Sequence, residues 1–152
     1  MKRITDLRKR VADFNEALTS GRIIQNIIWD NESYIVDLNA EEQLFEQGIN
    51  RLGVEISDYA PYSPVTIAIK EAKGQPTNRV TLRDEGDFES SFYLEVGDKQ
   101  FEIKASDFKT EDLIIKYGRQ ILGLTDENIS ILIWKYIFPD LMAETKKQIY
   151  GK

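Results

Sequence analysis

"NRVTLRDEGDFESSFYLEVGDKQFEIKA", residues 78–105, is the stretch that decides the fold. It begins with a β-like run, passes through an acidic segment with a central glycine, and ends in two further β-like runs on either side of Gly97–Asp98. Gly-Asp between two alternating runs is typical of the turn of an antiparallel hairpin. We therefore expect one small antiparallel sheet, with the rest of the chain arranged around it.

The acidic segment before the hairpin is interpreted as a turn of helix that leads into a strand. Asp84 is expected to cap this turn by accepting backbone N–H bonds, so that Asp84→Ala would cost about 1 kcal/mol of stability. Glu85 and Asp87 would then lie in the first helical turn, where the helix dipole favours negative charge. Phe88 and Phe92 are four residues apart and are expected to point into the core.

Catalytic and metal-binding interpretations of the same segment are weaker. An EF-hand needs oxygen ligands at positions that Phe88 and Phe92 occupy here. Asp84 and Asp87 can form a carboxylate pair for glycoside hydrolysis, but no aromatic platform accompanies them. Neither a Walker loop nor a dinucleotide fingerprint occurs. We therefore predict no catalytic, cofactor-binding or metal-binding residue, and keep a carboxylate-based hydrolase only as a minor alternative.

Composition narrows the function classes. The chain has no cysteine and no histidine, which excludes disulfides, thiolate chemistry and histidine-based triads, and with them nearly all zinc sites. The net charge of −6 argues against sequence-specific nucleic-acid binding. One basic cluster, interrupted by Asp6, is expected to be the solvated face of a helix; it consists of Lys2, Arg3, Arg8, Lys9 and Arg10.

The sequence predicts neither a membrane span nor a secretory signal. Apolar runs are far shorter than the roughly 20 residues of a transmembrane helix, and the first residues lack the apolar region of a signal peptide. A soluble intracellular product is expected.

Helices are expected at both ends of the chain. An apolar seam predicts an N-terminal helix over residues 3–20 that ends near Gly21, and core packing is favoured over a coiled coil; the seam consists of Ile4, Leu7, Val11, Phe14 and Leu18. C-terminal helices are expected over residues 109–150, with Thr110 and Thr125 as caps, Gly118 as a stop and a kink at Pro139.

The segments between these helices are less regular. Residues 23–39 are the least certain part of the fold: a short helix is expected first, and then a β-like run in "SYIVDLN". "AEEQLFEQGI" is predicted to be helical, with Gly48 near its end. A short helix is also expected between Ser63 as cap, Pro64 at its first position and Gly74 as stop. The prediction is an α+β single domain over residues 1–152, with its core in residues 42–108.

Two segments resemble a known family. "APYSPVTIAIKEAKG" and "VTLRDEGDFESSF" are similar to a region of bacteriophage virion-morphogenesis and tail-completion proteins, of the type found in Bacteroidetes phages and prophages. The family element G…W-x-P-L-S-P-x-T is matched by Gly53, Tyr59, Tyr62, Ser63, Pro64 and Thr66. The element L-x-D-T-G-x-L-x-x-S-I is matched by Leu82, Asp84, Gly86, Phe88, Ser91 and Phe92. A downstream Tyr-Gly element is matched by Tyr117 and Gly118.

The chain departs from the family pattern at two positions. Glu85 stands where the family usually has threonine, and Tyr59 stands where tryptophan is common. The signature residues are structural in the family, so the resemblance carries over no active site and no cofactor.

The resemblance implies a non-enzymatic structural protein of the virion. Such a protein would act in tail completion or head–tail joining as a component of a homo-oligomeric ring, with portal, adaptor or tail-tube proteins as partners. It would assemble in the host bacterial cytoplasm and end in the virion, without contacting a membrane. The alternative from a different class is an intracellular protein-binding or regulatory module.

Overall fold

The predicted hairpin is present at the centre of the fold. Strand β1 (Phe92–Val96) pairs antiparallel with β2 (Phe101–Ala105) in a two-stranded sheet, and the Gly97 N–H donates to the Gln100 carbonyl at 2.8 Å to close the turn. Leu94 and Ile103 are opposite each other and buried, as alternation along the strands requires. The sheet therefore has one face directed at the core.

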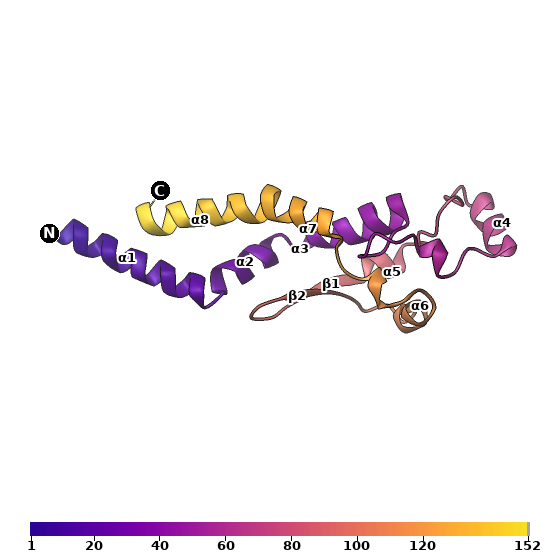
Figure 1. The fold of residues 1–152 in the computed structure, drawn as a ribbon, viewed down its shortest axis with the longest axis horizontal. Coiled ribbons are helices and arrows are strands. Elements are labelled where there is room, and N and C mark those ends of the chain that lie inside the picture. The colour runs from indigo at the N-terminus through magenta and orange to yellow at the C-terminus, as the bar shows by residue number, and fades with distance from the viewer. Residues whose placement is uncertain (152) are drawn as a thin grey trace.

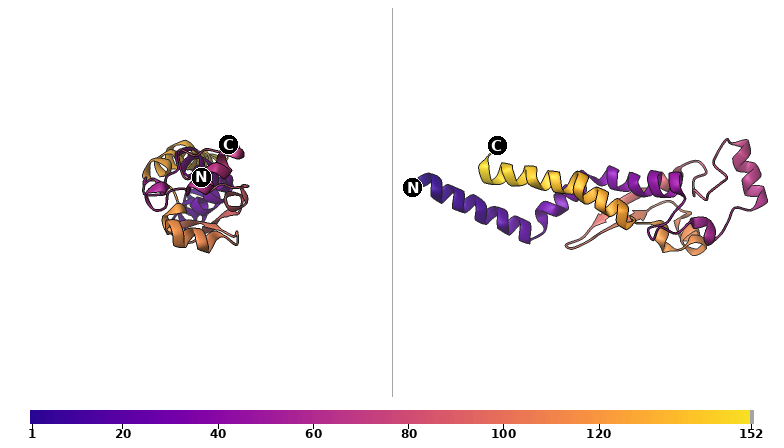
Figure 2. Two further views of the ribbon diagram at one scale, coloured as in Figure 1. Left: turned by 90° about the vertical axis from the view of Figure 1, so that its right-hand side faces the viewer. Right: turned by 45° about the horizontal axis from the view of Figure 1, so that its top comes forward.

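The computed structural model describes residues 1–151, and helices make up most of them. Together they form an elongated molecule, in which both chain termini lie near one end and α4 lies near the other (Figure 1). Seen along its long axis the molecule has a narrow outline (Figure 2). The predicted α+β class, with a small antiparallel sheet between terminal helices, is confirmed.

The N-terminal third is a series of helices separated by short breaks. The elements are α1 (Lys2–Thr19), α2 (Arg22–Asp30), α3 (Glu32–Asp37) and the π-helix η1 (Leu38–Gln47). Gly21 breaks the first two helices apart with a φ of +78°, and Gly48 ends η1 in the same left-handed region.

The predicted β-like run in "SYIVDLN" is wrong, because these residues are helical. Its β-branched residues favour a strand only weakly, and burial overrides that preference. Ile35 and Leu38 are almost completely buried on one side of the helical path, where α3 packs against β1.

The middle of the chain is largely irregular. Its elements are the 3₁₀ turn η2 (Ile56–Asp58), α4 (Pro64–Ala72) and the single helical turn α5 (Asp87–Ser90). The predicted cap of α4 is confirmed, since the Ser63 hydroxyl accepts from the Thr66 N–H at 3.1 Å. The β-like start of the opening stretch is wrong: residues 78–83 form no strand, and Leu82 has a φ of +61° that an extended strand does not allow.

The C-terminal part is helical. It consists of α6 (Thr110–Tyr117), the 3₁₀ turn η3 (Arg119–Ile121), α7 (Asp126–Leu132), the π-helix η4 (Ile133–Ile137) and α8 (Phe138–Tyr150). The predicted stop at Gly118 and cap at Thr125 are confirmed. The predicted cap at Thr110 is wrong, because Thr110 is the first helical residue and its hydroxyl finds no partner. Pro139 lies in the first turn of α8, directly after the π-helix, where its missing N–H is tolerated.

The two terminal helices form an arm, defined here as α1 together with α8, which lie side by side (Figures 1 and 2). The base of the arm is packed, because Phe14 and Leu18 contact a small cluster around Ile27. Toward the tip, the predicted core packing of the seam is wrong. Ile4 is 62% exposed and Leu7 44%, because α8 ends beside Arg10 and the first residues of α1 extend past it (Figure 1).

The base of the arm touches the hairpin turn. The Gln25 side-chain amide donates to the Gly97 carbonyl at 3.1 Å. A Cβ at Gly21 would lie 3.2 Å from the Asp98 carbonyl oxygen, so the break between α1 and α2 is closely apposed to the turn. The hairpin therefore contacts the point where the arm leaves the rest of the molecule.

A buried polar network joins η1 to the loop before α7. Gln43 is fully buried; its amide N–H donates to the Gly123 carbonyl at 2.9 Å, and its carbonyl accepts from the Thr125 N–H at 2.8 Å and from the Asn128 side chain at 2.9 Å. Asn39, one turn earlier, accepts from the Gly123 N–H at 2.9 Å. These side chains satisfy a loop that has no regular backbone partners.

Candidate functional site

Parts of the two segments that carry the resemblance meet around α4. The Thr81 N–H donates to the Tyr62 hydroxyl at 3.0 Å, and the buried Lys70 ammonium donates to the Arg83 carbonyl at 2.6 Å. Ser63, Pro64 and Thr66 begin that same helix. The segments around residues 62–66 and 81–84 are therefore brought together by contacts with one short helix.

Asp84 does not have its predicted role as a helix cap. The turn begins only at Asp87, and its N-cap is Gly86 in the left-handed region. Asp84 instead accepts from the Lys73 ammonium at 2.5 Å, and this hydrogen bond holds the pKa of the carboxyl below its ordinary value. Gly86, at a φ of +94°, is the N-cap instead, so the turn starts two residues later than expected.

The correction changes the expected result of Asp84→Ala. The ion pair with Lys73 is exposed, and exposed pairs contribute little to folding. Removal of a helix cap costs about 1 kcal/mol. We expect the free energy of unfolding of Asp84→Ala, measured by urea unfolding, to fall by much less than this. Ser63→Ala, which removes a cap that is present, is the matched comparison and should show the larger loss. An equal loss in both variants would contradict this assignment.

The remaining signature residues lie in the core or beside it, away from α4. Phe88 and Phe92 are buried, as predicted, with their rings edge to face at 4.9 Å. The Ser91 hydroxyl donates to the Phe88 carbonyl at 2.7 Å and accepts from the Asp107 N–H at 3.0 Å. Tyr117 is buried at the end of α6, followed by Gly118. The signature thus does not converge on a single site.

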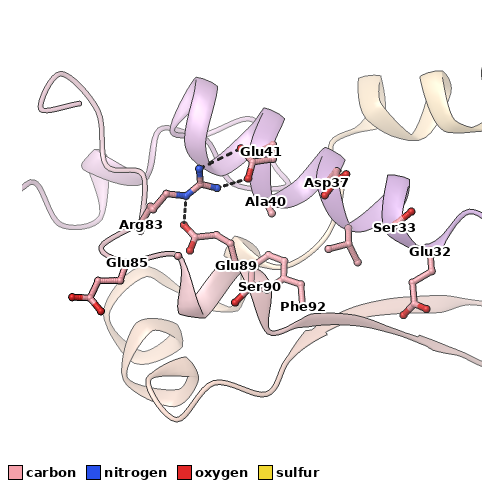
Figure 3. A pocket seen from close by; sticks show the side chains of 12 residues that line it. Glu32, Ser33, Asp37, Ala40, Glu41, Arg83, Glu85, Glu89, Ser90 and Phe92 are labelled. Carbon is pink, nitrogen blue, oxygen red and sulfur yellow. Dashed lines mark hydrogen bonds and ion pairs between the residues drawn. The ribbon is translucent and has the colours of Figure 1, made fainter. Parts of the chain in front are cut away.

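An acidic groove lies between the helices α3 and η1 on one side and the segment around α5 on the other (Figure 3). Its volume is about 600 Å³. Five of its lining residues are carboxylates, namely Glu32, Asp37, Glu41, Glu85 and Glu89. Its apolar surface comes from Val36, Ala40 and Phe92. We refer to this feature as the acidic groove.

Arg83 is the only cation among the lining residues and joins the two walls of the groove (Figure 3). Its guanidinium pairs with Glu41 of η1 at 2.5 Å and approaches Glu89 of α5 at 3.5 Å. The Phe45 ring lies 4.0 Å from the guanidinium carbon, a cation–π contact. One guanidinium thus faces two carboxylates, which leaves the groove with net negative charge.

Glu89 is the unusual member of this group. Its residue is only 5% exposed, and neither carboxylate oxygen has a hydrogen-bond partner among the described residues. Burial raises the pKa of Glu89 above its ordinary value, and the nearby Arg83 guanidinium only partly offsets this. A buried carboxylate without hydrogen bonds is costly, and the Arg83 guanidinium at 3.5 Å offsets only part of that cost.

Glu89→Gln is expected to stabilise the isolated protein at neutral pH by on the order of 1 kcal/mol, because it removes a buried charge that lacks hydrogen bonds. The native protein takes up the Glu89 proton at a higher pH than the unfolded chain does. The wild type therefore regains the lost stability as the pH falls through the raised native pKa, and fully below the ordinary value of 4.5. Urea unfolding at neutral and acidic pH tests this. A variant that is less stable at neutral pH would mean that the Arg83 contact dominates.

The sequence did not indicate this groove. Arg83 and Glu89 stand inside the opening stretch, but Glu41 lies 42 residues before Arg83. The carboxylate pair of the hydrolase alternative, Asp84 and Asp87, does not line the groove. Within residues 1–151, no cluster of acidic side chains has the geometry to hold a metal ion.

Comparisons with protein-family models, with curated proteins and with solved structures found no match. The family expectation therefore rests on the quoted signature residues alone. In the described part of the chain, no helix is both long enough and apolar enough to cross a bilayer.

Proposed function

We propose that this chain is a non-enzymatic structural protein of a phage or prophage virion, which acts in tail completion or head–tail joining as a component of a homo-oligomeric ring. The proposal takes its functional class from the signature around Ser63, Pro64 and Asp84. The observation that carries it is the arm, whose apolar side chains are exposed along two helices that extend from the body of the molecule.

Large apolar side chains are exposed on the arm and on the helices that lead into it. On α1 they are Ile4, Leu7 and Val11. On the run from α7 through α8 they are Ile129, Ile133, Trp134, Phe138 and Met142. Trp134 is 68% exposed, and its ring centroid lies 5.5 Å from that of Phe138. Large exposed apolar side chains grouped along the same helices are a feature of interaction sites.

An elongated subunit with an exposed apolar arm is better suited to an oligomer than to a monomer. Each copy would bury its arm against a neighbour, and repeated contacts of one kind close into a ring when the rotation allows. Neighbouring virion proteins of the portal, adaptor or tail-tube type would contact the ring. The same surface would stay hidden in the assembled particle, which accounts for its apolar character.

Native mass tests the proposal. Light scattering would be applied to the purified chain alone and then to its mixture with the products of the flanking genes. We expect a species of several copies, alone or on mixing. A persistent monomer that binds none of these products would overturn the proposal, and a one-to-one complex would point instead to a protein-binding module.

Light scattering of the double variant Leu7→Glu and Val11→Glu tests whether the arm carries the association. Charges on the exposed seam should abolish the large species. Leu52→Glu is the matched control, because Leu52 is 62% exposed and lies outside the arm.

A further inference from the structure

The tip of the arm carries a charge opposite to that of the rest of the chain. Among the first ten residues, five are Lys or Arg and one is Asp, although the whole chain has 20 basic and 26 acidic residues. Arg3, Arg8 and Lys9 are exposed and form no ion pair within residues 1–151.

The arm tip and the acidic groove are complementary in two respects. Around α1, Arg3 and Arg8 flank the apolar seam on its two sides, as helical periodicity requires. The groove presents the reverse pattern, with carboxylates along its walls and apolar surface from Val36, Ala40 and Phe92. Glu89 adds a buried carboxylate that has no hydrogen bond, with the Arg83 guanidinium 3.5 Å away. A basic, apolar helix therefore matches this groove in charge and in hydrophobicity.

The groove cannot be filled by the arm of the same chain. The arm tip lies at one end of the elongated molecule, whereas α3 and α5, which border the groove, lie toward the middle (Figures 1 and 2). An arm that enters the groove must therefore come from another copy.

We propose that the tip of α1 in one copy docks into the acidic groove of the next copy, with an arginine or lysine donating to Glu89. This inference rests on the proposed function, since it names the contact by which copies would join. The contact uses two different surfaces of each copy, so it repeats from copy to copy and closes only where the rotation permits.

Charge distinguishes this arrangement from two others. Two arms packed tip to tip would bring basic clusters together, and like charges across an interface oppose binding. A nucleic acid would satisfy Arg3 and Arg8, but its phosphates offer nothing to Ile4 or Leu7, and it would leave the groove empty. The second copy alone satisfies both surfaces.

A charge exchange tests the contact. The arm variant carries Arg3→Glu and Arg8→Glu. The groove variant carries Asp37→Lys and Glu85→Lys, two exposed lining residues that form no ion pair in the described structure and so leave the Arg83 pairs intact. Sedimentation over a range of concentrations at low salt would give the self-association constant. We expect each variant alone to weaken association at least about tenfold, and an equimolar mixture of the two to restore it.

Matched controls reverse the same number of charges elsewhere. Lys99→Glu with Lys116→Glu is the control for the arm, and Glu46→Lys with Glu71→Lys is the control for the groove, because none of these residues lies on α1 or lines the groove. Glu89→Gln should also weaken association, by about threefold or more, because it removes the buried charge that the incoming cation would meet.

Three outcomes would overturn the contact. In the first, the wild type stays monomeric at the highest concentration. In the second, the arm and groove variants associate as strongly as the wild type. In the third, the equimolar mixture of the two variants does not recover the association that each has lost. Binding of the wild type to a short DNA duplex, lost in the arm variant while self-association persists, would also overturn it in favour of nucleic acid. If copies associate through another surface, this contact fails while the proposed structural function stands.

Discussion

Gln43→Leu is expected to lower the free energy of unfolding by about 3 kcal/mol. Gln43 is fully buried, and its side chain satisfies the Gly123 carbonyl, the Thr125 N–H and the Asn128 amide. Leucine fills a similar volume but leaves all three groups without partners in a site that water does not reach. The cost arises from these orphaned groups rather than from a cavity. Urea unfolding followed by circular dichroism would measure the change.

Gln47→Leu is the matched control, because Gln47 ends the same π-helix and is exposed. It should change stability by no more than about 0.5 kcal/mol. Gln43→Leu should also increase hydrogen exchange in the loop over residues 121–125, which these bonds hold. A loss below about 1 kcal/mol would mean that the loop finds other partners and that the network contributes little.

Phe88→Ala is the second change with a large expected effect, a loss of about 3 to 4 kcal/mol. Phe88 is 4% exposed and joins α5 to the core below the hairpin, where its ring meets the Phe92 ring edge to face. Alanine would leave a cavity and remove the aromatic contact. Phe108→Ala is the matched control, since Phe108 is 84% exposed and should tolerate the change.

A double-mutant cycle of Phe88→Ala and Phe92→Ala would isolate the ring contact. Its coupling free energy is expected to be about 1 kcal/mol. Additive losses in the double variant would show that the two rings act independently, and the large effect of Phe88→Ala would then come from burial alone.

Local signals in the sequence predicted the parts of the fold that local chemistry determines. Ser63 and Thr125 cap helices, Gly118 ends one, and Gly97–Asp98 lies in the hairpin turn, because each of these residues acts on backbone groups within a few positions of itself. The N-terminal helix also agrees with the prediction to within one residue at each end.

The predictions were wrong where contacts between residues far apart in the chain determine the local structure. Residues 33–39 look β-like, but they are helical because Ile35 and Leu38 are buried against elements far along the chain. Asp84 looks like a cap, but its carboxylate pairs with Lys73, which directly follows α4. The seam around Leu7 looks like a core face, although periodicity shows which side of a helix is apolar and does not show what covers it.

The acidic groove could not be predicted from the sequence for the same reason. Arg83 and Glu89 belong to the opening stretch, but their contact with Glu41 depends on how η1 packs across the segment before α5. No spacing rule relates residues so far apart. Nor could composition indicate that Glu89, among 26 acidic residues, is one that is buried without a hydrogen bond.

The contact between the hairpin turn and the base of the arm helps to orient α1. Gly21 and Gln25 meet the turn at Asp98 and Gly97, so the position of that turn contributes, with the packing of α1 on α2 and α8, to the angle between α1 and the body. In a chain of subunits joined through α1, this angle determines the curvature of the whole assembly. The length of the hairpin, a feature remote from either docking surface, would then decide how many copies complete a circle.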